Sequence, residues 1–126
     1  MRLWLKSVKF AWQGVRFAFH YERNMRIHTV LASIAILLVV LLDISMVETL
    51  FILLALTLVI MSELFNTAIE KTLDIAQPEP HPLAKAAKDC AAAAVLVCSV
   101  FAAVVGLIIF GAHLLEGVTW RWTGRL

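Results

Sequence analysis

The chain has 126 residues, of which 62% are hydrophobic and only 16% are charged, and its formal net charge is +2. An average soluble domain is roughly half apolar and about a quarter charged, and a chain this short buries only about two-thirds of its surface on folding. The composition therefore excludes a disordered chain, a disulfide scaffold and almost any monomeric water-soluble domain, and it predicts a small membrane protein in one domain. The small net charge gives no reason to expect a nucleic-acid partner.

Residues 2–20 predict an amphipathic helix that lies in the membrane interface, and a polar segment follows it up to residue 28. The polar side chains recur at spacings of three and four, so they form one narrow stripe along a helix. These side chains are Arg2, Lys6, Lys9, Gln13, Arg16 and His20. The rest of the helix is rich in large apolar residues, and a basic stripe on such a helix is typical of a membrane surface. A soluble helix packed on a core is the alternative, but the apolar face is too wide for it.

Three apolar segments then predict three transmembrane helices, because each is close to or longer than the roughly 20 residues that a spanning helix needs. The predicted spans are residues 29–47, 49–70 and 83–115, and residues 43–48 predict a short turn where the first two spans meet. Residues 71–82 predict a loop, since the three prolines near its end do not fit a helix interior. Residues 116–126 form a C-terminal tail. The predicted fold class is an all-α integral membrane protein with an N-terminal interfacial helix and three spans.

The distribution of basic residues predicts the topology. Lys and Arg precede the first span and lie between the second and third, whereas the connection between the first two spans contains none. The positive-inside rule then places the N-terminus and the 71–82 loop in the cytoplasm and the C-terminus outside. Arg121 and Arg125 argue mildly against this orientation.

Polar side chains on the second span form the first candidate site. Glu63, Asn66, Glu70 and Asp74 share one face of a helix. A carboxylate at the depth of Glu63 is costly if it faces lipid, so it must face protein, a cation or water, and such residues are functional candidates. A polar seam that only holds helices together is the alternative. A polar seam between helices does not need three acidic side chains without a basic partner, so a functional site is favoured over a seam.

Further charged residues gather at the cytoplasmic edge, namely Glu22, Arg26, Lys88 and Asp89. Acids beside basic residues suggest Mg²⁺ held together with phosphates, because Mg²⁺ prefers one or two carboxylates, substrate phosphates and waters. The five glycines are too scattered for a glycine-rich phosphate loop. If ATP is used, side chains on helices must hold its phosphates.

Three motifs carry a resemblance to a known family. They are Glu22-Arg-Asn-Met-Arg-Ile-His28, Glu63-Leu-Phe-Asn-Thr-Ala-Ile-Glu70 with Asp74, and Ala84-Lys-Ala-Ala-Lys-Asp89. Over about residues 6–112 the chain resembles the small integral-membrane lipid kinases, which comprise bacterial diacylglycerol kinase and undecaprenol kinase. The resemblance implies a homotrimer in the bacterial cytoplasmic membrane, with active sites shared between subunits.

The resemblance also implies residue roles. Glu63 matches the general base that takes a proton from the lipid hydroxyl, and Asn66 is a polar neighbour of that base at the lipid site. Glu22 and Glu70 match the carboxylates that hold Mg²⁺ on ATP. The implied ATP contacts are Phe10, Glu22, Glu70, Glu79, His81, Lys88 and Asp89. Met25 and Ala93 depart from the family pattern, which usually has an aromatic residue and a glycine there.

The function hypothesis is an ATP- and Mg²⁺-dependent kinase that phosphorylates undecaprenol. Diacylglycerol is the alternative substrate, and the Arg26-Ile-His28 sequence favours undecaprenol because diacylglycerol kinases usually carry Arg-Gln-Glu there. A small oligomeric transporter subunit is a second hypothesis, but it does not require Glu22, Glu70, Lys88 and Asp89 at one aqueous edge. A structural membrane subunit is a third, and the acid cluster makes it the weakest.

Overall fold

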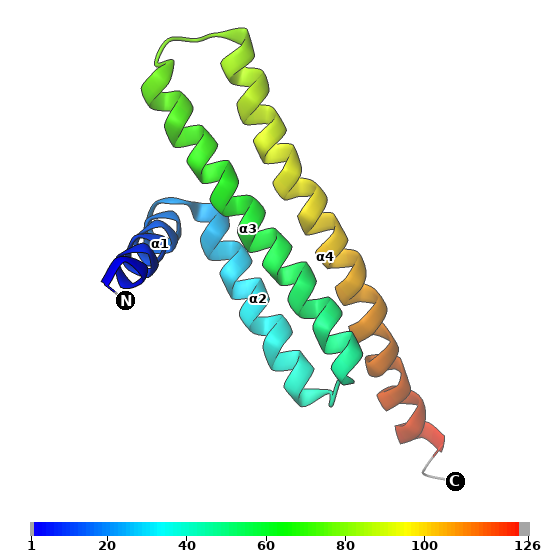
Figure 1. Ribbon diagram of the computed structural model, residues 1–126. Coiled ribbons are helices and arrows are strands. Elements are labelled where there is room, and N and C mark those ends of the chain that lie inside the picture. Colours follow the sequence, from blue (N-terminus) through cyan, green and yellow to red (C-terminus); the bar gives the residue numbers. More distant parts are fainter. Residues whose placement is uncertain (1, 124–126) are drawn as a thin grey trace.

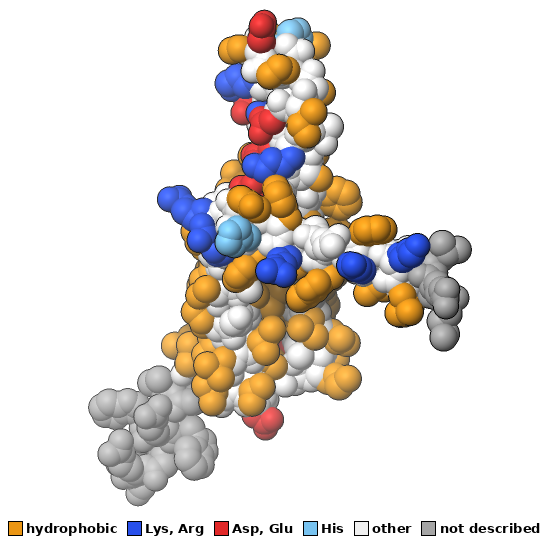
Figure 2. All heavy atoms as spheres, turned by 90° about the vertical axis from the view of Figure 1, so that its left-hand side faces the viewer, with side chains coloured by type: hydrophobic (Ala, Val, Ile, Leu, Met, Phe, Trp, Pro, Cys, Tyr) orange, Lys and Arg blue, Asp and Glu red, His pale blue; other side chains and the backbone are white. Residues whose placement is uncertain are grey.

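The computed structural model describes the backbone of residues 2–123 and the side chains of residues 4–115. The described chain forms four α-helices, α1 (Arg2–Tyr21), α2 (Arg23–Leu41), α3 (Met46–Ala76) and α4 (Pro82–Thr123). Helices α2, α3 and α4 run side by side, and α1 projects sideways from the start of α2 (Figures 1 and 2). The side chains of Arg2, Arg121 and Arg125 lie outside the described residues.

Three helices are long and apolar enough to cross a membrane: α2, α3 and the Pro82–Leu115 part of α4. The expectation of an all-helical chain with three such segments is thereby confirmed. At 1.5 Å per residue, α3 is about 46 Å long, which exceeds the roughly 30 Å thickness of a bilayer core. The α3–α4 hairpin therefore extends beyond one end of the apolar zone. Figure 2 shows charged side chains on this extension and around the base of α1, above a mostly hydrophobic shaft.

The turn between α2 and α3 lies close to the short turn predicted at residues 43–48, although it begins one residue earlier, at residue 42, and ends at residue 45. Helix α2 ends at Leu41 rather than at residue 47, and Asp43 adopts a positive φ of 51°. Ser45 then starts α3 through a capping box, in which its side chain accepts the Glu48 N–H while the Glu48 carboxylate accepts the Ser45 N–H. Side-chain caps satisfy the free N–H groups of a helix start, so this local chemistry decides the boundary.

The predicted 71–82 loop is shorter than expected. Helix α3 continues to Ala76, so only residues 77–81 connect it to α4. The polar residues after Glu70 are compatible with helix, and the break comes only with the prolines. Pro82 occupies the first position of α4, where a missing N–H costs nothing.

Helix α3 is the centre of the fold, because it contacts each of the other three helices. Its buried face is apolar over Ile52, Ala55 and Val59 and becomes polar from Ser62 onward. Ile52 joins Ile44 and Ile109 in a small core at the end of the bundle that lies away from α1. The polar half of the same face points to the junction of α1 and α2, and this half forms the candidate site.

Candidate active site

Glu63 is the most deeply buried large side chain of the described residues, with 2% of its surface exposed. Its Oε2 has no hydrogen-bond partner among the side chains that the structure describes. The nearby Thr67 hydroxyl is already used, because it donates to the backbone oxygen of Glu63 at 2.9 Å. A buried carboxylate oxygen without a partner is costly. The arrangement therefore suits a group that receives a hydrogen bond from a ligand.

Glu22 reaches this region from the break between α1 and α2. Its backbone is extended, with φ −101° and ψ 122°, and its side chain makes no capping hydrogen bond to α2. The carboxylate instead pairs with the Lys71 ammonium on α3 at 2.9 Å. The start of α2 favours a negative charge at this position.

Glu70 completes the acidic group. It lies two turns from Glu63 on α3 and accepts a hydrogen bond from the Asn66 amide at 3.3 Å. Both Glu22 and Glu70 lie close enough to Glu63 to interact with it electrostatically. The structure thus brings together Glu22, Glu63, Asn66 and Glu70, which the sequence had singled out. We call the three carboxylates, Glu22, Glu63 and Glu70, the acid cluster.

The acid cluster fits a cation that is shared with phosphates better than a metal site made by the protein alone. Among the described residues, no three His, Cys, Asp or Glu side chains are arranged to hold a metal ion. Two carboxylates with phosphate oxygens and waters are what Mg²⁺ prefers. In this structure the positive charge beside the acid cluster is the Lys71 ammonium, which pairs with Glu22.

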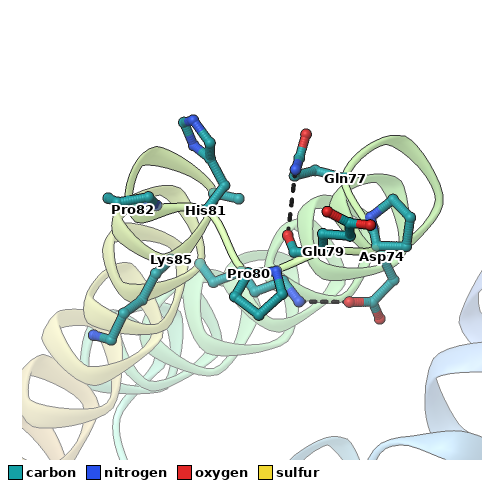
Figure 3. Close-up of a pocket in the computed structure, with 10 residues that line it drawn as sticks. Asp74, Gln77, Glu79, Pro80, His81, Pro82 and Lys85 are labelled. Atoms are coloured by element: carbon teal, nitrogen blue, oxygen red, sulfur yellow. Dashed lines mark hydrogen bonds and ion pairs between the residues drawn. The ribbon is translucent and has the colours of Figure 1, made fainter.

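A second site lies at the tip of the α3–α4 hairpin, where an open pocket of about 780 Å³ surrounds the connection. Four sequence candidates line it, namely Asp74 and the implied ATP contacts Glu79, His81 and Lys88. Figure 3 shows Asp74 on the α3 side of the pocket and Lys85 on the α4 side. Lys88 forms an ion pair with Asp74 and so ties the two helices together.

The connection itself is held by hydrogen bonds. The Gln77 amide donates to the Glu79 backbone oxygen at 3.3 Å, and the Leu83 N–H donates to His81 Nδ1 at 3.2 Å. Because Nδ1 accepts, a neutral His81 ring carries its proton on Nε2 and presents it as a donor. The pocket therefore offers donors on a short, proline-stiffened loop.

Two predicted nucleotide contacts do not line this pocket. Asp89 forms an ion pair with Lys85 on the same helix, and Phe10 is 64% exposed on α1. The tip pocket adjoins the outer end of the acid cluster, since Asp74 lies one turn, about 6 Å, beyond Glu70 along α3 and about 16 Å beyond Glu63. Within one chain, the candidate residues therefore run along α3 from the buried Glu63 to the tip pocket, while Phe10 and Asp89 do not line that pocket.

An apolar pocket of about 480 Å³ lies between α1 and α3 and was not expected from the sequence. Small residues of α1, among them Ala11, Gly14 and Ala18, face Leu64 and Thr67 of α3 there. Thr67 lies one turn from Glu63 on α3, so the pocket adjoins the helix face that carries the buried carboxylate. Lys71 borders the same pocket. The sequence pattern did not mark it as a site residue. The spacing of small residues on α1 was the available signal for the pocket.

The prokaryotic diacylglycerol kinase family model matches residues 9–110. The chain belongs to this family. A diacylglycerol kinase of Synechocystis is 42% identical over 81% of the chain, but the match covers only 59% of that protein. An undecaprenol kinase of Bacillus subtilis is 40% identical over 83% of the chain and 85% of its own length. A diacylglycerol kinase of Escherichia coli is 29% identical over 86% of the chain and 89% of its length.

These matches confirm the resemblance that the three motifs carried. The family is one of lipid kinases, and membership implies ATP-dependent phosphoryl transfer to a lipid. They also favour a kinase over the transporter and structural-subunit hypotheses. The relatives with similar identities are named as kinases of two different lipids, so the family assignment covers both diacylglycerol and undecaprenol as substrates.

Proposed function

We propose that the chain transfers the γ-phosphoryl group of ATP to the hydroxyl of undecaprenol and so produces undecaprenyl phosphate, with diacylglycerol as the alternative substrate. One observation carries the proposal. The buried, unpartnered Oε2 of Glu63 lies near two further carboxylates, and Thr67, one turn along α3 from Glu63, lines an apolar pocket. A lipid alcohol needs the apolar pocket, and a nucleotide with its cation needs the carboxylates.

The reaction assigns Glu63 the role of general base. Its Oε2 accepts the proton of the lipid hydroxyl while the hydroxyl oxygen bonds to the γ-phosphorus and the bond to ADP breaks. Glu63 lies about 10 Å from Glu70 along α3, on the side of the apolar shaft. The order from membrane to water is then lipid hydroxyl, base, acidic pair and nucleotide. Asn66 fixes Glu70 and stands beside the lipid site.

Glu22 and Glu70 are the proposed holders of Mg²⁺, which when bound neutralises charge on the phosphates. The remaining proposed nucleotide contacts are Phe10, Glu79, His81, Lys88 and Asp89. Lys88 supports this role because its ammonium lies at the mouth of the tip pocket. Phosphoryl transfer depends mainly on such positioning and charge neutralisation.

The proposal includes a homotrimer in the bacterial cytoplasmic membrane, with the N-terminus in the cytoplasm and α1 in the interface. Helix α1 and the α3–α4 connection lie toward the same end of the bundle, which supports one common aqueous face (Figure 1). Phe10 does not line the tip pocket of its own chain. A contact of Phe10 with adenine bound in the tip pocket would come from a neighbouring subunit, in line with the shared sites of the proposed trimer.

Undecaprenol is preferred because of the Arg26-Ile-His28 sequence. The test is a competition experiment in which purified protein, Mg²⁺ and labelled ATP meet equal amounts of undecaprenol and diacylglycerol in one bilayer. We expect most of the label in undecaprenyl phosphate. Label mainly in phosphatidic acid would reverse the substrate assignment and leave the kinase assignment intact.

A further inference from the structure

Lys71 is the basic side chain that meets the acid cluster, and the family motifs give it no role. Its Nζ lies 2.9 Å from Glu22 Oε1, and 43% of its side chain is exposed against 20% for Glu22. Its charge also interacts with Glu70 and Asp74. Lys71 therefore stands where three helices meet, on the water-facing edge of the acid cluster.

The neighbouring cations do not offer the same contact. Arg23 and Arg26 are exposed at the start of α2 and take part in none of the ion pairs formed by the described side chains. The acid cluster carries up to three negative charges, and like charges in one site repel. Without a bound cation, the Lys71 ammonium is the charge that offsets this repulsion.

We propose that Lys71 is a built-in counter-cation, which holds Glu22 in place while no divalent ion is bound and gives up that carboxylate when Mg²⁺ arrives. The inference rests on the proposed function, because it takes Glu22 and Glu70 as the metal-holding pair. Lysine suits this exchange, since its ammonium is a point charge on a flexible stem. Its exposure lets the stem turn toward solvent or toward the phosphates of a nucleotide.

The first test uses electron paramagnetic resonance to measure Mn²⁺ binding to the purified full chain saturated with a non-hydrolysable ATP analogue. We expect Lys71→Gln to bind Mn²⁺ about five- to tenfold more tightly, because one competing positive charge is removed a few ångströms from the metal. Lys71→Arg keeps the charge and should stay closer to the wild type. Lys6→Gln is the control, since it removes an exposed positive charge of α1 that takes part in none of the ion pairs formed by the described side chains, and it should leave Mn²⁺ affinity unchanged.

A purely structural role for Lys71 predicts a different result. In that case Lys71→Gln lowers the thermal unfolding midpoint equally with and without Mn²⁺, and Mn²⁺ affinity does not rise, which would overturn the inference. The counter-cation role predicts a lowered midpoint in chelator that Mn²⁺ restores. Glu22→Gln separates this inference from the proposed function. If it leaves Mn²⁺ affinity unchanged, the metal assignment itself fails.

A second measurement needs no variant and so does not depend on how Lys71→Gln folds. Acetylation of lysines in the wild-type protein is followed by mass spectrometry with and without saturating Mn²⁺. Release from Glu22 should increase the labelling of Lys71 severalfold relative to the exposed Lys9 of α1. Equal labelling of Lys71 in both conditions would refute the exchange.

Discussion

Replacing Glu63 by glutamine should separate activity from stability. The substitution keeps the shape of the side chain but removes the base, and general-base catalysis contributes about 10²- to 10⁴-fold to rate. We therefore expect kcat to fall by at least about two orders of magnitude. The affinity for nucleotide should stay the same, because Glu22, Glu70 and the tip pocket are untouched.

The same substitution should not destabilise the fold. Glu63 is 2% exposed, its Oε2 lacks a partner, and two other carboxylates act on it. The Asn66 Oδ1 is likewise buried without a partner, and Asn66 lies one turn away on the same helix face. A glutamine amide removes the repulsion and supplies donors for such an acceptor. The expected gain is about 1–2 kcal/mol in the free energy of unfolding.

Glu48→Gln is the matched control, because it makes the same change in the first turn of the same helix, about 22 Å from Glu63. Glu48 completes the capping box of α3 and contacts His113 at 3.3 Å. Its replacement should lower stability and leave kcat intact, which is the reverse of the Glu63 result. Kinase assays and chemical unfolding of both variants in the same detergent provide the comparison. Loss of stability in Glu63→Gln together with retained activity would mean that Glu63 belongs to a polar seam and is not the base.

Three further predictions follow from the site and the fold. Glu70→Ala should weaken Mg²⁺-ATP binding about 10- to 100-fold in calorimetric titration, since a charged contact is lost, and unchanged affinity would count against the metal role. Gly14→Leu should raise the KM for the lipid roughly tenfold without changing the KM for ATP, by displacing about ten close carbon contacts from the apolar pocket. Gly14→Ala should be tolerated, because a Cβ there meets no atom within 4 Å, and equal lipid KM values for both variants would argue against a lipid chain in this pocket. Ser45→Ala should cost about 1 kcal/mol of stability through the lost cap while activity persists, and an unaltered unfolding curve would contradict the importance of the cap.

The sequence predicted the helices and the shared face of Glu63, Asn66 and Glu70, because both follow from composition and from the 3.6-residue period. It placed the end of α1 and the start of α4 within one residue, but it extended the first span to residue 47 instead of Leu41 and ended the second at residue 70 instead of Ala76. No glycine or proline occurs between residues 15 and 77, so the breaks at Glu22 and at residues 42–45 carry no such signal. They depend on packing and on the Ser45 cap.

The pairing of Glu22 with Lys71 also lay beyond sequence reasoning, because it depends on how the break at Glu22 sets α1 and α2 against α3. The apolar pocket has the same origin, since it exists only where α1 crosses α3. In contrast, the tip pocket was partly predictable. The prolines of residues 78–82 marked the connection, although its start at Gln77 and the Lys88–Asp74 ion pair required the fold.

The central claim is that this chain alone moves phosphate from ATP to a lipid alcohol. The most direct measurement uses the purified protein in nanodiscs that contain undecaprenol, with Mg²⁺ and γ-labelled ATP, and it counts ADP and labelled lipid together. We predict one labelled lipid monoester for each ADP formed, and no labelled lipid from Glu63→Gln. The contradicting result is ADP formation that leaves the label only in inorganic phosphate, both in nanodiscs with undecaprenol and in parallel nanodiscs with diacylglycerol.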